Sequence, residues 1–558
     1  MNELRPYLRM LATYRGRMLL GSILVFATIA AGVGLLALSG WFITATGVTA
    51  LALAAGMQAQ LEIYVPGAGI RFFALARTAA RYVERVQNHD TVLRLLADLR
   101  QRVFARLTAL DPAALARFRN ALVLNRLTAD IDALDSLYLR CLAPPVAAVL
   151  AVLGVAVMLG LIDPLAGIVV GTVLLLGTGL LTAAVAWPGS AIGESVAQRT
   201  ESARTEIVDL VRGLAELRTF GVVDRQQAAI DRSDRALVAL QQRAARLAAL
   251  GEAGMGLVIH LAMVLALFVG VWLYTADAVS GPLAVLMPLA VLALLEGLAP
   301  VPGGLLQLGR ARAAARRLNS QSAVEPTICE PRAPAVPPDT GELAFDQVDA
   351  GRSEAPEPIL RDFSLHLAEE EHVAVIGPSG CGKSTLADLA VRLLDPLRGE
   401  VRLGGVPLPG LALTDIHERI SYLTQRSEIF SDTITGNLML ARPDADDRAL
   451  WYALEVVALA DFVEDLDQGL DTWVGESGVR LSGGQARRLA LARIVLRGAP
   501  VIVLDEPLAG LDAATAATVA ARLKPWLRGR TTLLLAHDTT ALPTVDRIVE
   551  LNTLPATA

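Results

Sequence analysis

A glycine-rich loop between a strand and a helix constrains this chain most. It reads Gly377-Pro378-Ser379-Gly380-Cys381-Gly382-Lys383-Ser384-Thr385 and matches G-x-x-x-x-G-K-[ST]. An apolar, strand-like run (372–376) precedes it and a run with helical periodicity (386–391) follows, which is the context this motif needs. The backbone N–H groups of such a loop surround phosphate oxygens. We therefore expect an ATP site, with Lys383 at the β/γ-phosphates and Ser384 on Mg²⁺.

Lysine usage strengthens this interpretation over a chance match. Among 50 basic residues, only Lys383 and Lys524 are lysines. A lysine at this place, in a chain that otherwise uses arginine, indicates that a compact ammonium group is required.

Composition predicts a membrane half and a soluble half. The 558 residues are 53% hydrophobic and only 19% charged, with a mean hydropathy of +0.48, which is typical of membrane spans. The net charge of −6 gives no indication of nucleic-acid binding. Cys141, Cys329 and Cys381 are too far apart to predict a disulfide or zinc framework.

Six membrane spans are expected, all before residue 300, and the first is read as a retained span rather than a cleaved signal peptide. They lie near 18–42, 61–83, 142–162, 165–187, 254–274 and 283–298. Arginines gather before the first span, in the links 84–141 and 188–253, and after the last span, which predicts cytoplasmic termini. Both long links are expected to be helical and to turn near 111–119 and 216–224. These turns are either docking elements for the soluble half or plain solvated loops.

The second span carries an unusual row of ionisable residues, Arg71, Arg77, Arg81, Arg85 and His89. The last four are spaced by four and share one helix face. Ionisable groups at membrane depth usually face a cavity, and guanidinium groups suit a cargo with carboxylates. An imidazole is also a possible haem ligand. The alternative is that Arg81 and Arg85 extend to the headgroups. His260 and Glu296 are weaker candidates for this route, because a single polar residue on an apolar helix more often packs.

We expect a six-span domain at 1–320, a proline-rich linker at 321–341 and an α/β nucleotide-binding domain at 342–558. In the last domain, a buried-strand run ends in Asp505 and Glu506. Asp505 is the predicted Mg²⁺ ligand, and Glu506 is expected to polarise the attacking water. Gln425 and His537 each follow a strand and are expected near the γ-phosphate, Gln425 also near Mg²⁺.

A second anion site is expected at the start of a helix over 486–496. The segment before it reads Leu481-Ser482-Gly483-Gly484-Gln485. In this order the motifs resemble the ATP-binding-cassette (ABC) transporter family. The resemblance covers the whole chain and implies a six-span domain of the type I exporter (type IV ABC) fold, joined to a P-loop ATPase that drives transport. It also implies a dimer, since the 481–485 segment of one subunit closes over the ATP of its partner.

Further motifs resemble the CydC subunits of the CydDC exporters. They are 38–42 (LSGWF), 69–71 (GIR), 77–85 (RTAARYVER), His89-Asp90, 115–119 (LARFR), 129–135 (ADIDALD) and 296–301 (EGLAPV). This resemblance implies a heterodimer with a CydD-like half in the bacterial inner membrane, needed for cytochrome bd assembly. It implies export of cysteine and glutathione, haem transport, or both, with His89 as the candidate haem ligand.

Two departures keep other functions open. Arg352 stands where the family usually has an aromatic ring against adenine, and the usual C-terminal helices are expected to be missing or trimmed, so hydrolysis at the two ATP sites is expected to be unequal. A regulatory half that binds ATP with little turnover is one alternative. A lipid or drug exporter is another, although the arginine row disfavours a neutral apolar cargo.

Overall fold

A computed structural model describes residues 2–116, 126–351, 358–537, 539, 543 and 545–551. Arg352 and the motif residues 117–119 lie outside the described residues. The chain divides into two compact units, Met1–Ala109 with Phe118–Glu325, and Leu110–Arg117 with Pro326–Ala558. The short α4 (Pro112–Ala116) and residues 326–341 of the expected linker thus fall within the second unit, whereas residues 321–325 belong to the first. Asp111 joins them, because its carboxylate caps α4 and accepts from the Thr327 N–H and hydroxyl, both at 2.7 Å.

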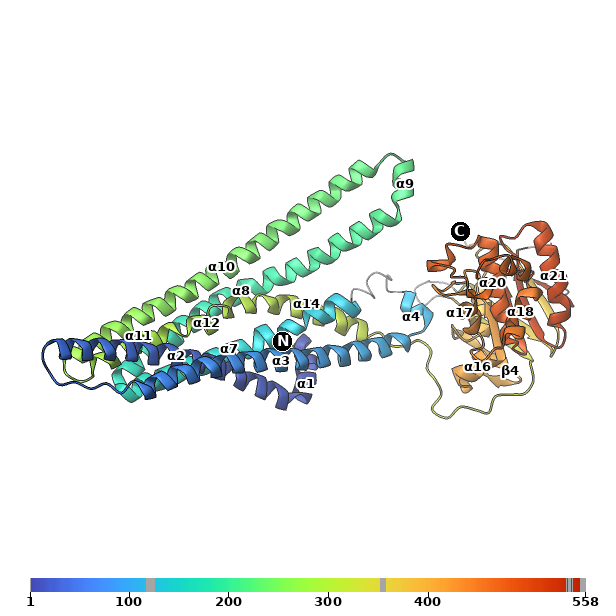
Figure 1. The fold of residues 1–558 in the computed structure, drawn as a ribbon. Helices are drawn as coiled ribbons and strands as arrows, with labels where there is room; N and C mark the ends of the chain where they lie inside the picture. The colour runs from blue at the N-terminus through green and yellow to red at the C-terminus, as the bar shows by residue number, and fades with distance from the viewer. Residues whose placement is uncertain are drawn as a thin grey trace. The chain divides into compact units, whose positions relative to one another are not determined.

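The first unit is helical. Its main helices are α1 (Arg5–Thr13), α2 (Arg15–Ala54), α3 (Tyr64–Thr108), α7 (Ala143–Ile162), α8 (Pro164–Arg212), α9 (Leu214–Thr219), α10 (Val223–Thr275), α11 (Gly281–Leu292), α12 (Leu295–Leu298), α13 (Val301–Leu305) and α14 (Gln307–Ser322). Asp163 begins α8 by accepting from the Ala166 N–H at 2.8 Å. The long helices α8 and α10 run side by side and are joined by α9, at the second predicted turn (Figure 1).

Five described helices are long and apolar enough to cross a membrane: Arg15–Ala54, Leu127–Ile162, Pro164–Arg212, Val223–Thr275 and Gly281–Leu305. The remaining expected span, the second (61–83), lies in α3. This helix has 45 residues and is long enough to cross a membrane, but it carries the row of arginines. Those charges lower its hydropathy and explain why it differs from the other five.

The last membrane helix departs from regular geometry at two points. It consists of α11, α12 and α13, with turns near residues 293 and 299 at which the backbone keeps right-handed helical angles. The first turn lies within the span expected at 283–298, and the second lies just after it. Pro300 and Pro302 lack the N–H that a continuing helix needs, and Gly303 and Gly304 weaken it further. The segment that carries Glu296 is therefore only one turn long.

Facing glycines allow α14 to approach α8 closely. A Cβ atom on Gly309 would lie 1.9 Å from the Ser190 carbonyl oxygen, and one on Gly193 would lie 2.6 Å from the Leu306 oxygen. Neither backbone atom can move aside without shifting its helix. The contact between these helices therefore requires glycine at both positions.

We predict that Gly309→Val destabilises the protein by roughly 1–3 kcal/mol, the usual cost of forcing atoms into a packed contact. A lower Tm of the detergent-purified protein checks this. Gly179→Val is the matched control, because a Cβ there would meet no atom within 4 Å. Equal Tm values for the two variants would contradict the packing argument.

The second unit contains two sheets. A four-stranded antiparallel sheet has the order β2-β1-β4-β5, from β1 (Leu343–Ala350), β2 (Leu360–Leu367), β4 (Arg398–Leu403) and β5 (Val406–Pro407). A parallel sheet has the order β6-β7-β8-β3-β9, from β3 (His372–Ile376), β6 (Ile420–Leu423), β7 (Val501–Asp505), β8 (Thr531–Ala536) and β9 (Arg547–Glu550). The helix α15 (Lys383–Ala390) follows β3.

The parallel order brings the expected catalytic segments together. Strands β6, β7, β8 and β3 are neighbours and point the same way. Residues that follow their carboxyl ends must therefore meet at one edge, as is usual in open α/β sheets. The glycine loop, Gln425, Glu506 and His537 all follow these strands.

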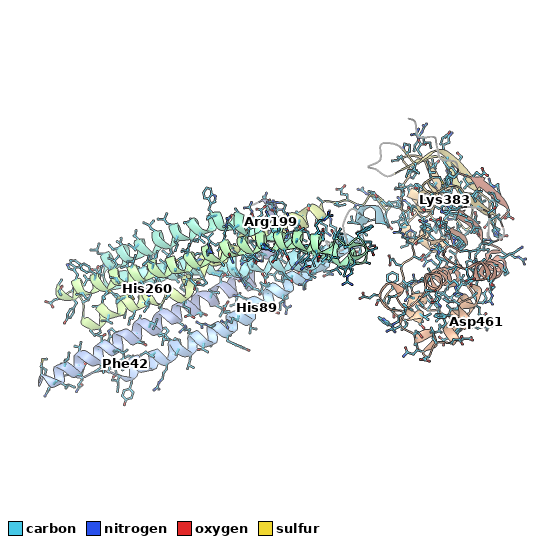
Figure 2. All side chains as sticks on the ribbon, turned by 90° about the horizontal axis from the view of Figure 1, so that it is seen from above. Phe42, His89, Arg199, His260, Lys383 and Asp461 are labelled. Carbon is cyan, nitrogen blue, oxygen red and sulfur yellow. The ribbon has the colours of Figure 1, made fainter. Side chains whose placement is uncertain are left out.

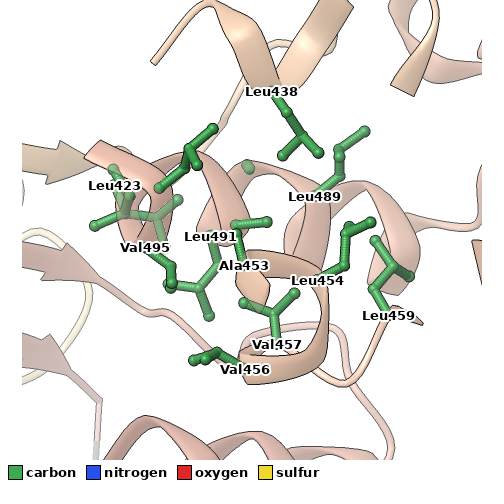
Figure 3. Packing of buried hydrophobic residues seen from close by; sticks show 14 of the residues in the cluster. Leu423, Leu438, Ala453, Leu454, Val456, Val457, Leu459, Leu489, Leu491 and Val495 are labelled. Atoms are coloured by element: carbon green, nitrogen blue, oxygen red, sulfur yellow. The ribbon is translucent and has the colours of Figure 1, made fainter. Parts of the chain in front are cut away.

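Two hydrophobic clusters support this edge. One buries α15 between the two sheets, through Leu386, Leu389 and their neighbours. The other packs helix α20 (Gly483–Arg497) against α18 (Asp447–Val456), where Leu489 and Leu491 meet Ala453 and Leu454 (Figure 3). The 481–485 segment thus begins a helix in a different cluster from the glycine loop.

Candidate functional site

The Lys383 side chain folds back onto the glycine loop that precedes it. Gly380 and Gly382 have φ values of 83° and 108°, which favour glycine. Lys383 is buried, and its Nζ donates to the carbonyl oxygens of Gly377 at 2.7 Å and Pro378 at 3.0 Å. The ammonium group is thus held by weak, exchangeable acceptors that a phosphate oxygen could replace.

A hydroxyl and a carboxylate meet beside it. The Ser384 hydroxyl donates to Asp505 Oδ2 at 2.7 Å. Two oxygen ligands that converge in this way suit Mg²⁺, which prefers hard oxygen donors. Asp505 is buried at the end of β7, and this burial raises the pKa of its carboxyl, although the Ser384 hydrogen bond and the Arg487 and Lys383 charges oppose the rise.

Glu506 lies at the centre of the expected catalytic residues. Its Oε1 is 2.7 Å from His537 Nε2 and 3.4 Å from Gln425 Nε2. His537 Nδ1 in turn lies 3.5 Å from Lys383 Nζ. Glu506 has a φ of 52°, unusual for a non-glycine residue, and its N–H donates to the Leu535 carbonyl. Of the three expected Mg²⁺ ligands, Ser384 and Asp505 contact each other, whereas Gln425 contacts Glu506.

The 481–485 segment forms a rigid start to α20. Ser482 Oγ accepts from the Gln485 N–H at 3.2 Å, and Gln485 Oε1 accepts from the Ser482 N–H at 2.8 Å. This capping box leaves the Gly483 and Gly484 amides at the helix start. The expected second anion site thus coincides with a capped helix start.

Sequence reasoning missed Arg487, which lies beneath the catalytic residues. This buried guanidinium donates to the carbonyl oxygens of Thr424 (2.6 Å), Gln425 (3.3 Å) and Glu506 (2.9 Å), and also to that of Asp505. It therefore joins the loop after β6 to the end of β7. Its position two residues after the 481–485 segment was visible in the sequence, but its partners follow from the fold alone.

A cavity in the helical unit contains part of the arginine row. Its volume is about 270 Å³, and Arg81, Arg85, Glu84, Asn88 and Glu296 are among its lining residues. Asn88 is buried, donates to Glu84 Oε1 at 2.7 Å and accepts from the Tyr138 hydroxyl at 3.2 Å. The cavity is thus lined by charges of both signs.

Glu296 pairs with two of these arginines. Its Oε2 accepts from Arg77 and its Oε1 from Arg81. The sequence indicated Glu296 only as a minor candidate and gave no sign of this contact. By contrast, Arg71 and His89 are exposed on α3, and neither is among the residues that line the cavity. Figure 2 marks His89, and also His260 on α10, whose Nδ1 is 2.7 Å from the Gly256 carbonyl oxygen one turn earlier.

Comparison with known proteins decides the family. The ABC transporter transmembrane region model matches residues 22–294, and the ABC transporter model matches residues 360–509. The chain is 35% identical to the "Glutathione/L-cysteine transport system ATP-binding/permease protein CydC" of Escherichia coli (strain K12), over 98% of this chain and 95% of that protein. The chain belongs to the CydC family of ABC transporters.

Two further likenesses agree with this membership. The CydC-family chain is 30% identical to the Bacillus subtilis (strain 168) protein "Glutathione/L-cysteine transport system ATP-binding/permease protein CydD", over 88% of the chain and 85% of that protein. Its fold matches the "Structure of a bacterial Atm1-family ABC exporter with ATP bound", with a TM-score of 0.79 and 24% identity over 97% and 95% of the two chains. The predicted fold class and the prediction of an ATP-hydrolysing, multi-pass membrane exporter are thus confirmed.

The raised pKa of Asp505 generates a stability prediction. Since the native pKa lies above the ordinary 3.8, the ionised carboxylate lowers the nucleotide-free stability at neutral pH, and stability increases as the pH falls toward that native pKa. Asp505→Asn should therefore raise the Tm without nucleotide while abolishing Mg²⁺-dependent ATPase activity. Asp444→Asn, an exposed control, should change neither. A lower Tm for Asp505→Asn would contradict the argument.

Proposed function

We propose that this chain is the CydC-like half of a heterodimeric ATP-driven exporter in the bacterial inner membrane, with a CydD-like half as its partner. The observation that carries the proposal is the arrangement of Lys383, the Ser384–Asp505 pair and the Glu506–His537 pair at one sheet edge. The 481–485 segment and the glycine loop belong to different packing clusters, which supports ATP sites completed by a second subunit. The arginine distribution supports cytoplasmic termini.

The residues at the sheet edge divide the hydrolytic work. Lys383 would exchange its two carbonyl acceptors for phosphate oxygens, and the glycine-loop amides would hold the remaining charge. Ser384 and Asp505 would hold Mg²⁺, which neutralises charge on the β- and γ-phosphates when bound. Glu506 would accept a hydrogen bond from the attacking water, and His537 and Gln425 would orient that carboxylate.

The proposed cargo is a small molecule that carries carboxylates. The arginines on α3 and the cavity that Arg81 and Arg85 line support it. The CydC and CydD relatives are named as glutathione/L-cysteine transport system proteins, which favours a thiol cargo. Haem is the second candidate, because His89 lies one turn beyond Arg85, is exposed and has no hydrogen bond or ion pair with any described residue.

Two alternative functions remain. One is a regulatory half that binds ATP with little turnover, and the other is an exporter of lipids or drugs. The complete set Lys383, Ser384, Asp505, Glu506 and His537 favours hydrolysis over regulation. The ionic lining of the cavity disfavours a neutral apolar cargo.

Glu506→Gln tests the proposal directly. We expect the ATPase rate of the assembled pair in nanodiscs to fall by about 10²–10⁴-fold, as loss of a general base does, while ATP still binds. Glu455→Gln, which changes a carboxylate on α18 outside this site, should keep the wild-type rate. Unchanged ATPase in Glu506→Gln would show that the partner's site performs the hydrolysis and would favour the regulatory alternative.

An absorbance titration tests the two cargo candidates. If haem is a cargo, haem added to the purified pair should give a Soret band that shifts in His89→Ala and persists in His260→Ala, whose imidazole already bonds its own helix. If the cargo is a thiol, glutathione should stimulate ATPase activity, and the His89→Ala variant should respond as the wild type does. A lack of response to either compound would overturn the cargo proposal.

A further inference from the structure

Two arginines of the row are already paired with a carboxylate of the chain, which bears on how the cavity accepts its cargo. This inference rests on the proposed function. Both oxygens of the Glu296 carboxylate are engaged, one by Arg77 and one by Arg81. Each guanidinium contributes only one terminal nitrogen to this contact. A guanidinium has five N–H donors, and no other hydrogen bond to these two arginines is present among the described residues. Most of their donors thus remain available to another carboxylate.

The charge around the cavity limits how many carboxylates can bind there. Arg81, Arg85, Glu84 and Glu296 line the cavity, and Arg77 joins them through its ion pair with Glu296. A cargo that adds two carboxylates would bring four anionic groups to these three guanidiniums. Like charges held at short distance repel one another. A bound cargo of this kind therefore favours the departure of one resident carboxylate.

Glu296 is the resident carboxylate that is better placed to leave. Glu84 is hydrogen-bonded to Asn88 on its own helix. Glu296, in contrast, belongs to the four-residue α12, and its side chain is 54% exposed. This side chain can turn away from the arginines while Leu294 and Leu298, on either side of it, stay buried in the helical core.

We propose that Glu296 is a built-in counterion, which holds Arg77 and Arg81 while the cavity is empty and which a cargo carboxylate displaces. The exchange breaks two ion pairs to Glu296 and forms two to the cargo, with no net change of protonation. It also removes the two ion pairs between α12 and α3. Because α13 and α14 follow α12 toward the linker, the loss of these ion pairs would be transmitted along the chain and would report cargo binding.

The experiment measures cargo affinity of the assembled pair in nanodiscs without ATP. The probes are labelled glutathione and haem, each compared with its ester, in which the carboxylates are blocked. Glu296→Gln removes the competing charge, so the half-saturating concentration of the acid that binds should fall about fivefold, equivalent to about 1 kcal/mol. Affinity for the ester should not change. Glu252→Gln, which lines a different cavity, is the matched control and should behave as wild type.

Arg81→Gln separates failure of the exchange from failure of the cargo site. If Arg81→Gln weakens acid binding but Glu296→Gln leaves it unchanged or weakens it, the site stands and the exchange is wrong. Weaker binding in Glu296→Gln would place its carboxylate against a cationic group of the cargo. If Arg81→Gln also binds both acids as the wild type does, the proposed cargo site itself is wrong.

Hydrogen exchange gives a second measurement that does not depend on the glutamine variant assembling. In the wild-type pair, the acid cargo should accelerate amide exchange over 293–306, whereas the ester should not. Glu296→Asp, which keeps the charge but shortens its reach to the two arginines, should show faster exchange there before cargo is added. Equal protection with acid, ester and no cargo would overturn the exchange.

Discussion

The charged groups at the two candidate sites meet opposite charges or oriented polar groups of the chain itself. An isolated ion removed from water costs several kcal/mol, so each buried or cavity-facing charge requires a partner. In the nucleotide-binding unit, Lys383 meets two carbonyl oxygens, Asp505 meets a hydroxyl, and Glu506 meets an imidazole. In the helical unit, Arg77 and Arg81 meet Glu296.

In the function proposed above, a ligand would replace these partners. Phosphate oxygens would take over from the carbonyl oxygens as acceptors for Lys383, and Mg²⁺ would replace the hydrogen bond between Ser384 and Asp505. A cargo carboxylate would replace Glu296 in the same way. Each ligand would then exchange existing contacts and would not have to collect dispersed groups.

The sequence indicated the parts of the expected nucleotide site because each part is local. The glycine loop, the strand ending in Asp505 and Glu506, and the 481–485 segment each lie within a few residues, and parallel strand order brings the first two together. The sequence could not predict the Glu296 contact, because the arginines and the glutamate are separated by more than 200 residues. It also missed the turn near residue 293 in the last membrane helix, since the hydropathy of the apolar run around it carries no mark of a local change in helix geometry. Arg487 was missed because its partners are backbone carbonyls, which carry no side-chain signature.

Arg487 links the loop that carries Gln425 to the strand end that carries Glu506. One terminal nitrogen of its guanidinium donates to the carbonyl oxygens of Thr424 and Gln425, and the other donates to those of Asp505 and Glu506. A displacement of the loop after β6 would therefore pull, through the Arg487 side chain, on the backbone that carries Glu506. A substitution at Arg487 would loosen both segments at once.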